Sequence, residues 1–375
     1  MIQSIYKLTL VLLCMTCFHA SIKAESILKK ETYTEVIERS FDINKEGDVE
    51  LSNKYGKMEV ITWDKPKVEV KVTITVKAKS KDDAQEEFDR IIVEFDNSSS
   101  FVSAKTEIEE KKSSWWGWSS SNSSDFKINY EVYLPGTVKL DAANKYGNMF
   151  IPTMDADLKV TQKYGNFDID GVNGNLEFYL GYGNGTVAFA HNVEGYIKYS
   201  NLSIDKADNV ELESKYSKMR FDQINELKSE SKYDKYTIEQ VGSIKNEGKY
   251  DHFDLGEVNE LDIYTKYTDC RVDRLNQEAS FDCAYGSVKI YKLSKDFNEI
   301  EIEGSYTSFR ISREGSVGLE FDVETKYADI DVPSDSDFTK KIRDGSSKHY
   351  VGHTGSGNTN KRIEAELDYG SFELN

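Results

Sequence analysis

Few residues of this sequence are spaced for chemistry. His349 and His353 stand four residues apart, a spacing at which two histidines on one helix can hold zinc. They lie in a Gly/Ser-rich stretch rather than on a helix, and no cluster of cysteines or carboxylates joins them. The motifs G-x-S-x-G and H-E-x-x-H and the nucleotide-binding glycine loops are absent from the sequence. It therefore predicts no catalytic residue, no metal site and no cofactor.

Three tryptophans are the best candidates for binding. Trp115, Trp116 and Trp118 lie in KKSSWWGWSSSNSSD, a Ser-rich loop whose own residues cannot bury three large rings. Exposed aromatic side chains in a loop can stack on sugars or dock on a protein. The alternative is that the rings fold back over an apolar face nearby. We take these three residues as the candidate binding surface.

The first 24 residues are typical of a secretory signal peptide. Lys7 precedes the apolar run LTLVLLCMTCF, and small residues follow at Ala20 and Ala24. The run is shorter than the ~20 residues that a membrane span requires, and no later segment is long and apolar enough. We therefore expect an exported, soluble mature chain with no transmembrane segment, located in the periplasm, on the cell surface or outside the cell.

The net charge limits which partners the chain can bind, and the cysteine content indicates whether disulfides can stabilise it. The net charge is −18, and it becomes −20 when Lys7 and Lys23 leave with residues 1–24. Such a surface repels phosphate backbones, so no nucleic acid is expected as a partner. The mature chain keeps only Cys270 and Cys283, too few for a disulfide framework. We expect two buried thiols, with a disulfide between them as the alternative.

One word, of the form K-Y-G/S/D followed by a polar and then an apolar residue, recurs through the chain. An isolated first copy lies at Tyr55, and from Tyr146 onward the steps are mostly 17 or 18 residues and later 21, with a last step of 42. The tyrosines that mark it are Tyr55, Tyr146, Tyr164, Tyr182, Tyr199, Tyr216, Tyr233, Tyr250, Tyr267, Tyr285, Tyr306, Tyr327 and Tyr369. A fixed period of this length indicates stacked repeats that share one core.

Apolar residues keep fixed offsets from each tyrosine. They stand six residues before it and five after it, as Leu227 and Ile238 do for Tyr233. The spacing of two within each half predicts strands, and the glycine that follows six of the tyrosines predicts a corner with positive φ. Each copy is then two short strands and two tight corners. The predicted fold is an all-β parallel solenoid, similar to a single-stranded β-helix, with coils of 17–21 residues.

A lysine directly precedes the tyrosine in nine of the thirteen copies and points to solvent by the same alternation. Stacking would align these lysines into a column with a spacing of ~5 Å. We interpret the column as a solvated face that discourages aggregation, with a basic stripe that binds an acidic polymer as the alternative. The tyrosines are interpreted as a structural ladder before a sugar platform.

The domain boundaries follow from where the word is interrupted. Residues 25–135 form a lead coil and a capping subdomain, with strands and one helix near residues 80–91, where Ser80 is the N-cap. Residues 113–124 are the Ser/Trp-rich loop of this subdomain. Residues 136–375 are the solenoid, and 343–361 is a Gly/Ser-rich loop in place of one coil.

The segment YEVYLPGTVKLDAANKYGNMFI, which leads into the coils after a short acidic helix and strands, carries a resemblance. The chain resembles, over roughly residues 35–375, a family of exported bacterial β-solenoid proteins described as "putative adhesins". The resemblance implies this fold and an adhesin-like role. It implies no catalytic residues.

Three functions remain open on this evidence. The first is a non-catalytic, exported, adhesin-like scaffold or binding module of the cell envelope, with an envelope or extracellular glycan or a protein as its partner. The second is a polysaccharide lyase or hydrolase, which other β-helices carry on longer coils with a groove of clustered Asp, Lys and Arg. The third is an envelope sensor or assembly factor that acts through one protein partner. We favour the first.

Overall fold

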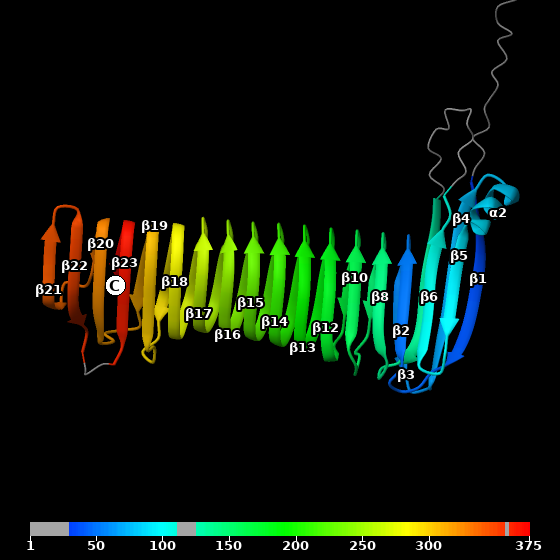
Figure 1. Cartoon of the computed structure of the whole chain (residues 1–375), viewed down its shortest axis with the longest axis horizontal. Coiled ribbons are helices and arrows are strands. Elements are labelled where there is room, and N and C mark those ends of the chain that lie inside the picture. Colours follow the sequence, from blue (N-terminus) through cyan, green and yellow to red (C-terminus); the bar gives the residue numbers. More distant parts are fainter. Residues whose placement is uncertain (1–29, 111–124, 357–359) are drawn as a thin grey trace, which may run out of the picture.

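The computed structural model describes residues 30–110, 125–356 and 360–375. This part of the chain is almost wholly strand and forms a parallel β-solenoid of about 10 turns, with a strand region at its N-terminal end and one helix. Figure 1 shows the strands side by side in one long array, with the helix at the N-terminal end. The predicted fold class is confirmed.

The N-terminal region begins with a coil that stacks on the rest of the solenoid. β2 and β3 of this coil pair in parallel with β8 and β9. β6 and β7 then pair in parallel with β2 and β3, so they continue the same stack, while β1, β4 and β5 add antiparallel strands outside it. The elements are β1 (Glu31–Asp42), β2 (Asp48–Lys54), β3 (Met58–Trp63), β4 (Lys67–Ala78), α2 (Lys81–Asp89), β5 (Ile91–Asn97), β6 (Phe101–Ile108) and β7 (Asp125–Pro135).

The one helix forms where the sequence predicts it. The Ser80 hydroxyl accepts a hydrogen bond of 3.1 Å from the backbone N–H of Asp83, which satisfies one of the free donors of the first turn. Asp82 and Asp83 place negative charge at the positive end of the helix dipole. Ala84 is buried, and the partly buried Phe88 packs against the core, so α2 packs one face against β4, β1 and β5.

The coils that follow pair in parallel, each in register with its neighbours. The early ones hold two strands each, whereas from β13 to β17 a single strand of 15 residues makes up the coil. The strands are β8 (Lys139–Lys145), β9 (Met149–Ile151), β10 (Leu158–Lys163), β11 (Phe167–Ile169), β12 (Val172–Gly181), β13 (Asn184–Lys198), β14 (Asn201–Lys215), β15 (Lys218–Lys232), β16 (Lys235–Lys249), β17 (His252–Lys266) and β18 (Asp269–Leu293).

The prediction of two strands and two corners per coil is thus wrong for the central coils. In β15 the alternation of buried and exposed residues slips between Phe221 and Ile224 and again between Ile224 and Leu227. All three side chains stay buried, because the bent strand wraps around the core while its ladder to the next coil continues. The strand ends only at the tyrosine corner.

At the corner, the residue with the left-handed backbone conformation is not the glycine that the sequence predicts but the tyrosine before it. All thirteen repeat tyrosines have φ between 50° and 64°, whereas of the six glycines that follow them only Gly370 has a positive φ. Glycine is needed at this position because a side chain would collide with the neighbouring coil. A Cβ on Gly165 would lie 2.1 Å from the carbonyl oxygen of Gly147 in the neighbouring coil. The strained conformation of the tyrosines costs of order 1–3 kcal/mol each, which the surrounding ladder and ring stacking must offset.

The C-terminal coils do not stack in sequence order. The elements there are β19 (Glu299–Arg313), β20 (Leu319–Asp331), β21 (Asp337–Asp344), β22 (Ser347–Thr354) and β23 (Arg362–Leu374). β23 pairs in parallel with β19 on one side and with β20 on the other, so it fills a gap between them (Figure 1). β20 is thus the last coil in space, and β22 and β21 pair antiparallel outside it.

The sequence predicts a loop for the Gly/Ser-rich segment 343–361, and this is wrong for part of the segment. β22 lies inside it, and Tyr350 of β22 is 2% exposed. The strand forms because β20 presents a free edge that antiparallel pairing can satisfy. The outermost strand, β21, carries Lys340, Lys341 and Arg343 on a largely exposed edge, which disfavours pairing with further chains.

Candidate binding surface

The repeat tyrosines form one continuous stack along an edge of the solenoid. We call this row the tyrosine ridge. Its twelve neighbouring ring pairs have centroid distances of 4.6–5.2 Å and interplanar angles of 1–18°. Tyr369 of the inserted strand stands between Tyr306 and Tyr327, so the row is unbroken there. At the N-terminal end the edge of Phe126 closes the stack against Tyr55.

The ridge presents ring edges and not ring faces. Each tyrosine is 41–54% exposed, but for every tyrosine between the two ends of the row, Tyr55 and Tyr327, the neighbouring rings cover both faces. A sugar stacks on an aromatic face, so the ridge cannot act as a stacking platform along its length. Its exposed chemistry is a row of ring edges and hydroxyl groups, with one ring per coil. The tyrosines are a structural ladder, as the sequence predicts.

The lysines beside the ridge lack carboxylate partners. Among the described residues, Lys215 is the one member of the column with a carboxylate oxygen within 4.0 Å, that of Glu213 at 2.8 Å. The ammonium groups of Lys145 and Lys232 lie instead 4.7 Å and 5.4 Å from the ring centroids of Tyr146 and Tyr233. The column members are Lys54, Lys145, Lys163, Lys198, Lys215, Lys232, Lys249, Lys266 and Lys326.

Buried polar side chains hold the corners beneath the ridge. In the middle coils the residue after the tyrosine accepts a hydrogen bond from the backbone N–H of the equivalent residue one coil earlier. We call these residues the polar seam: Ser200, Ser217, Asp234, Asp251 and Thr268, each 3–5% exposed. The five bonds measure 2.6–3.3 Å. The seam thus replaces the glycine contact of the early coils with a side-chain bond.

The two acids of the seam are costly to ionise. Burial raises the pKa of Asp251 to about 7, despite hydrogen bonds from the backbone of Asp234 and the hydroxyl of Ser231. Burial also raises the pKa of Asp234. An unfolded aspartate titrates near ~3.9. The folded state therefore binds more protons than the unfolded state between about pH 4 and pH 7, and stability falls as pH rises through this window.

Asp251→Asn should remove much of this pH dependence. The amide oxygen still accepts the bond from Asp234, and no charge is buried at pH 8. We expect the variant to melt higher than the wild type at pH 8 and to lose this advantage at pH 5.5, measured by circular dichroism melting at both pH values. An equal shift at both would show that the carboxyl group does not titrate in this window.

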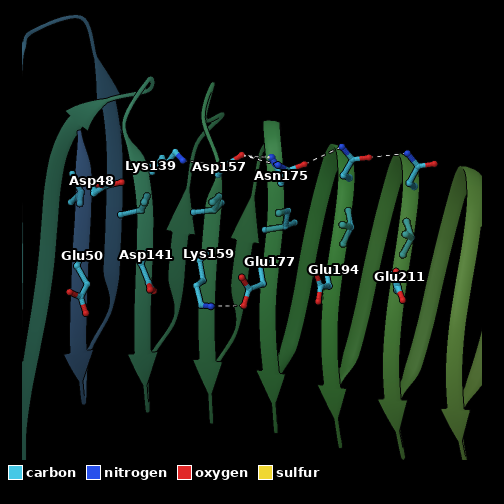
Figure 2. A pocket seen from close by; sticks show the side chains of 18 of the residues that line it. Asp48, Glu50, Lys139, Asp141, Asp157, Lys159, Asn175, Glu177, Glu194 and Glu211 are labelled. Atoms are coloured by element: carbon cyan, nitrogen blue, oxygen red, sulfur yellow. Dashed lines mark hydrogen bonds and ion pairs between the residues drawn. The ribbon is translucent and has the colours of Figure 1, made fainter. Parts of the chain in front are cut away.

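A shallow groove runs across the coils on the strands that lead to the tyrosines. Its volume is about 760 Å³, and two outward rows of polar side chains line it (Figure 2). The carboxylates are interleaved with lysines: Lys159 lies 2.5 Å from Glu177, and Lys228 lies 2.7 Å from Glu211. Other groove acids, among them Asp141 and Glu194, have no lysine or arginine nitrogen of a described residue within 4.0 Å, and burial raises the pKa of Asp141. Pairing therefore occupies only part of the carboxylates in the groove.

The histidines and cysteines singled out in the sequence do not come together into one site in the described part of the chain. His349 and His353 lie on β22, where His349 Nε2 is 2.8 Å from Asp322 Oδ1. In the described ranges no three His, Cys, Asp or Glu side chains gather as metal ligands. Cys270 and Cys283 are free and buried, as expected, and burial raises the pKa of the Cys283 thiol to about 12.

The tryptophans of the predicted binding surface, Trp115, Trp116 and Trp118, lie outside the described residues, as does the predicted signal peptide, residues 1–24. The structure describes the chain on either side of them, up to residue 110 and from residue 125. β6 and β7 stack on β2 and β3, which flank the Tyr55 corner of the next coil. Residues 111–124 thus connect these two strands where the other coils have their tyrosine corner. No helix in the described ranges is long and apolar enough to cross a membrane.

No family model and no curated protein matches the sequence. Solved structures similar to the chain include a "putative cell adhesion protein" from Clostridium sporogenes, at 9% identity over 92% of this chain and 99% of that one (TM-score 0.21). A "putative adhesin" from Bacteroides fragilis matches at 9% identity over 91% and 97% (TM-score 0.19). A "putative lipid binding protein" from Parabacteroides distasonis matches at 10% over 91% and 97% (TM-score 0.24). Two of these descriptions agree with the resemblance seen in the sequence, and TM-scores this low carry no argument about activity.

Proposed function

We propose that this protein is an exported, non-catalytic, adhesin-like scaffold of the cell envelope, which binds an envelope or extracellular partner. The unbroken tyrosine ridge carries the proposal. It is a continuous exposed aromatic edge on an acidic chain, and such surfaces on proteins mark interaction sites. Export is proposed from the leader-like residues 1–24.

The regular coils support a role as a spacer. Thirteen stacked tyrosines with a strand spacing of ~4.8 Å extend roughly 60 Å. One outward pattern repeats along this length, which suits separation of an anchored end from a binding end. We place specific recognition outside the repeated coils, in residues 111–124, through Trp115, Trp116 and Trp118.

Replacing these three tryptophans by serine should weaken binding to envelope preparations by at least about tenfold, since each aromatic platform contributes ~0.5–1.5 kcal/mol. The melting temperature should stay close to that of the wild type. Binding is measured by sedimentation of the protein with envelope fractions.

Trp63→Ser is the matched control. Trp63 stacks at a tilt on Tyr133 with centroids 5.3 Å apart, and its indole N–H donates to the carbonyl of Lys67. This variant should lower the melting temperature. If the triple variant behaves in the same way and still binds, the three tryptophans belong to the core and the proposal for them is wrong.

A further inference from the structure

The side chains next to the lysine column differ in charge between its first coils and the coils that follow. In the coils of Tyr55 to Tyr199 the outward residues two positions before the lysine site are uncharged: Ser52, Ala143, Thr161, Tyr179 and Tyr196. In the next three coils the same position holds Glu213, Glu230 and Glu247. The column is thus flanked by neutral residues in its first part and by glutamates in the next three coils, while Tyr264 holds this position beside Lys266.

The far side of the ridge is also uncharged in four of the early coils. The outward residue two positions after the tyrosine is Asn148, Asn166, Asn184 and Asn201 in four successive early coils. Side-chain bonds of 2.8 Å and 2.7 Å link the last three of these amides into a neutral ladder. The same position holds Lys57 in the first coil, Lys218, Lys235 and His252 in the three coils after Asn201, and Asp269 and Asp329 further along. The coils of Tyr146 to Tyr199 therefore have uncharged side chains at both positions next to the ridge.

The early lysines keep their charge available. No carboxylate oxygen of a described residue lies within 4.0 Å of Lys54, Lys145, Lys163 or Lys198. Among the later members Lys215 pairs with Glu213, while Lys232 and Lys249 stand near glutamates of the flanking position without a contact this short. Lys163 and Lys198 lie 4.7 Å and 5.6 Å from the ring centroids of Tyr179 and Tyr199. Rings position these cations without neutralising them.

We propose that this early stretch, defined by Lys54, Lys145, Lys163 and Lys198 with the tyrosines beside them, binds a linear polyanionic glycan laid along the solenoid axis. The inference rests on the proposed function and names its ligand class. Ammonium groups repeated at multiples of the coil spacing, ~4.8 Å, match a polymer with regularly spaced carboxylates better than a small ligand. Phenol hydroxyls beside them donate hydrogen bonds to sugar oxygens.

The surrounding charge gives this stretch its selectivity. A chain with net charge −18 repels a polyanion over most of its surface, so attraction is expected where the side chains directly beside the ridge are uncharged or basic and the acids of the groove, such as Glu177 and Glu194, stand further from it. A nucleic acid is disfavoured, because its bases bind single-strand sites by stacking on aromatic faces, and the faces here are covered. The attraction lies between exposed charges and is therefore weakened by salt.

The test uses residues 25–375 and isothermal titration with polygalacturonate, with neutral dextran and an oligothymidylate as comparison probes, at low and high salt. We expect polygalacturonate alone to bind, and to bind more weakly as salt rises. The triple variant Lys145→Gln, Lys163→Gln and Lys198→Gln should lose about tenfold or more in affinity.

The matched control is Lys215→Gln, Lys232→Gln and Lys249→Gln, which removes the same charge from the same column among acidic neighbours. Its affinity should stay near that of the wild type. Equal losses in the two triple variants, binding to dextran, equal binding to oligothymidylate, or no binding to polygalacturonate would each overturn the inference. The proposed function fails separately, if the wild type is not retained on envelope fractions.

Discussion

Deleting residues 362–375 should detach the C-terminal end of the solenoid while leaving the earlier coils folded. β23 pairs on both sides, and Ile363, Leu367 and Phe372 are 0–1% exposed between β19 and β20. Each such side chain contributes ~1.5–3 kcal/mol by burial, a large share of the ~5–15 kcal/mol of a typical domain. Because stacked repeats contact only their neighbours, the loss should stay local.

Limited proteolysis checks this outcome, with cleavage expected in residues 314–361 and protection of residues 30–110 and 125–313. A synthetic peptide of residues 362–375, added to the truncated chain, should restore protection by re-forming the inserted strand. The same peptide with Phe372→Asp should not, since it would bury a carboxylate. A truncated chain that resists protease like the full chain would contradict the role given to β23.

Ile238→Asp should unfold several coils around β16. Ile238 is 2% exposed and lies in register with Phe221 and Leu255 of the neighbouring coils. An unpaired carboxylate buried among these side chains costs several kcal/mol. We expect a melting transition that is lower by many degrees, or a separate early transition for the central coils.

Lys232→Asp is the control for direction, because Lys232 stands on the exposed side of the same sheet in β15. Its melting temperature should stay near that of the wild type. If Lys232→Asp destabilised the protein and Ile238→Asp did not, the assignment of inward and outward positions would be reversed.

The repeated word was enough to predict the coil, its inward positions and the column of lysines. Ile238 and Leu227 are buried where their offsets from Tyr233 place them. The position of β23 could not be predicted in this way. Every copy carries the same inward pattern, so the pattern does not specify which coils become neighbours, and the step of 42 residues to Tyr369 fits a skipped coil as well as an inserted one.

The corner and the surface were only partly predictable. Left-handed backbone favours glycine, so the pattern pointed to Gly165 and its equivalents, whereas stacking holds Tyr164 in that conformation. The polar seam had a visible signal, since Ser, Asp or Thr replaces the corner glycine from Ser200 to Thr268. Its bonds depend on contacts between coils, which periodicity alone does not supply. The pairing of the groove acids with lysines depends on the same contacts.

The most direct test of a non-catalytic binding scaffold is a binding isotherm on purified envelope glycan, in which the size distribution of the glycan is followed alongside bound protein. We predict saturable binding of residues 25–375 with the glycan chain length unchanged after prolonged incubation. Shortened glycan chains would identify an enzyme instead, and the absence of any retained protein would contradict the adhesin-like role.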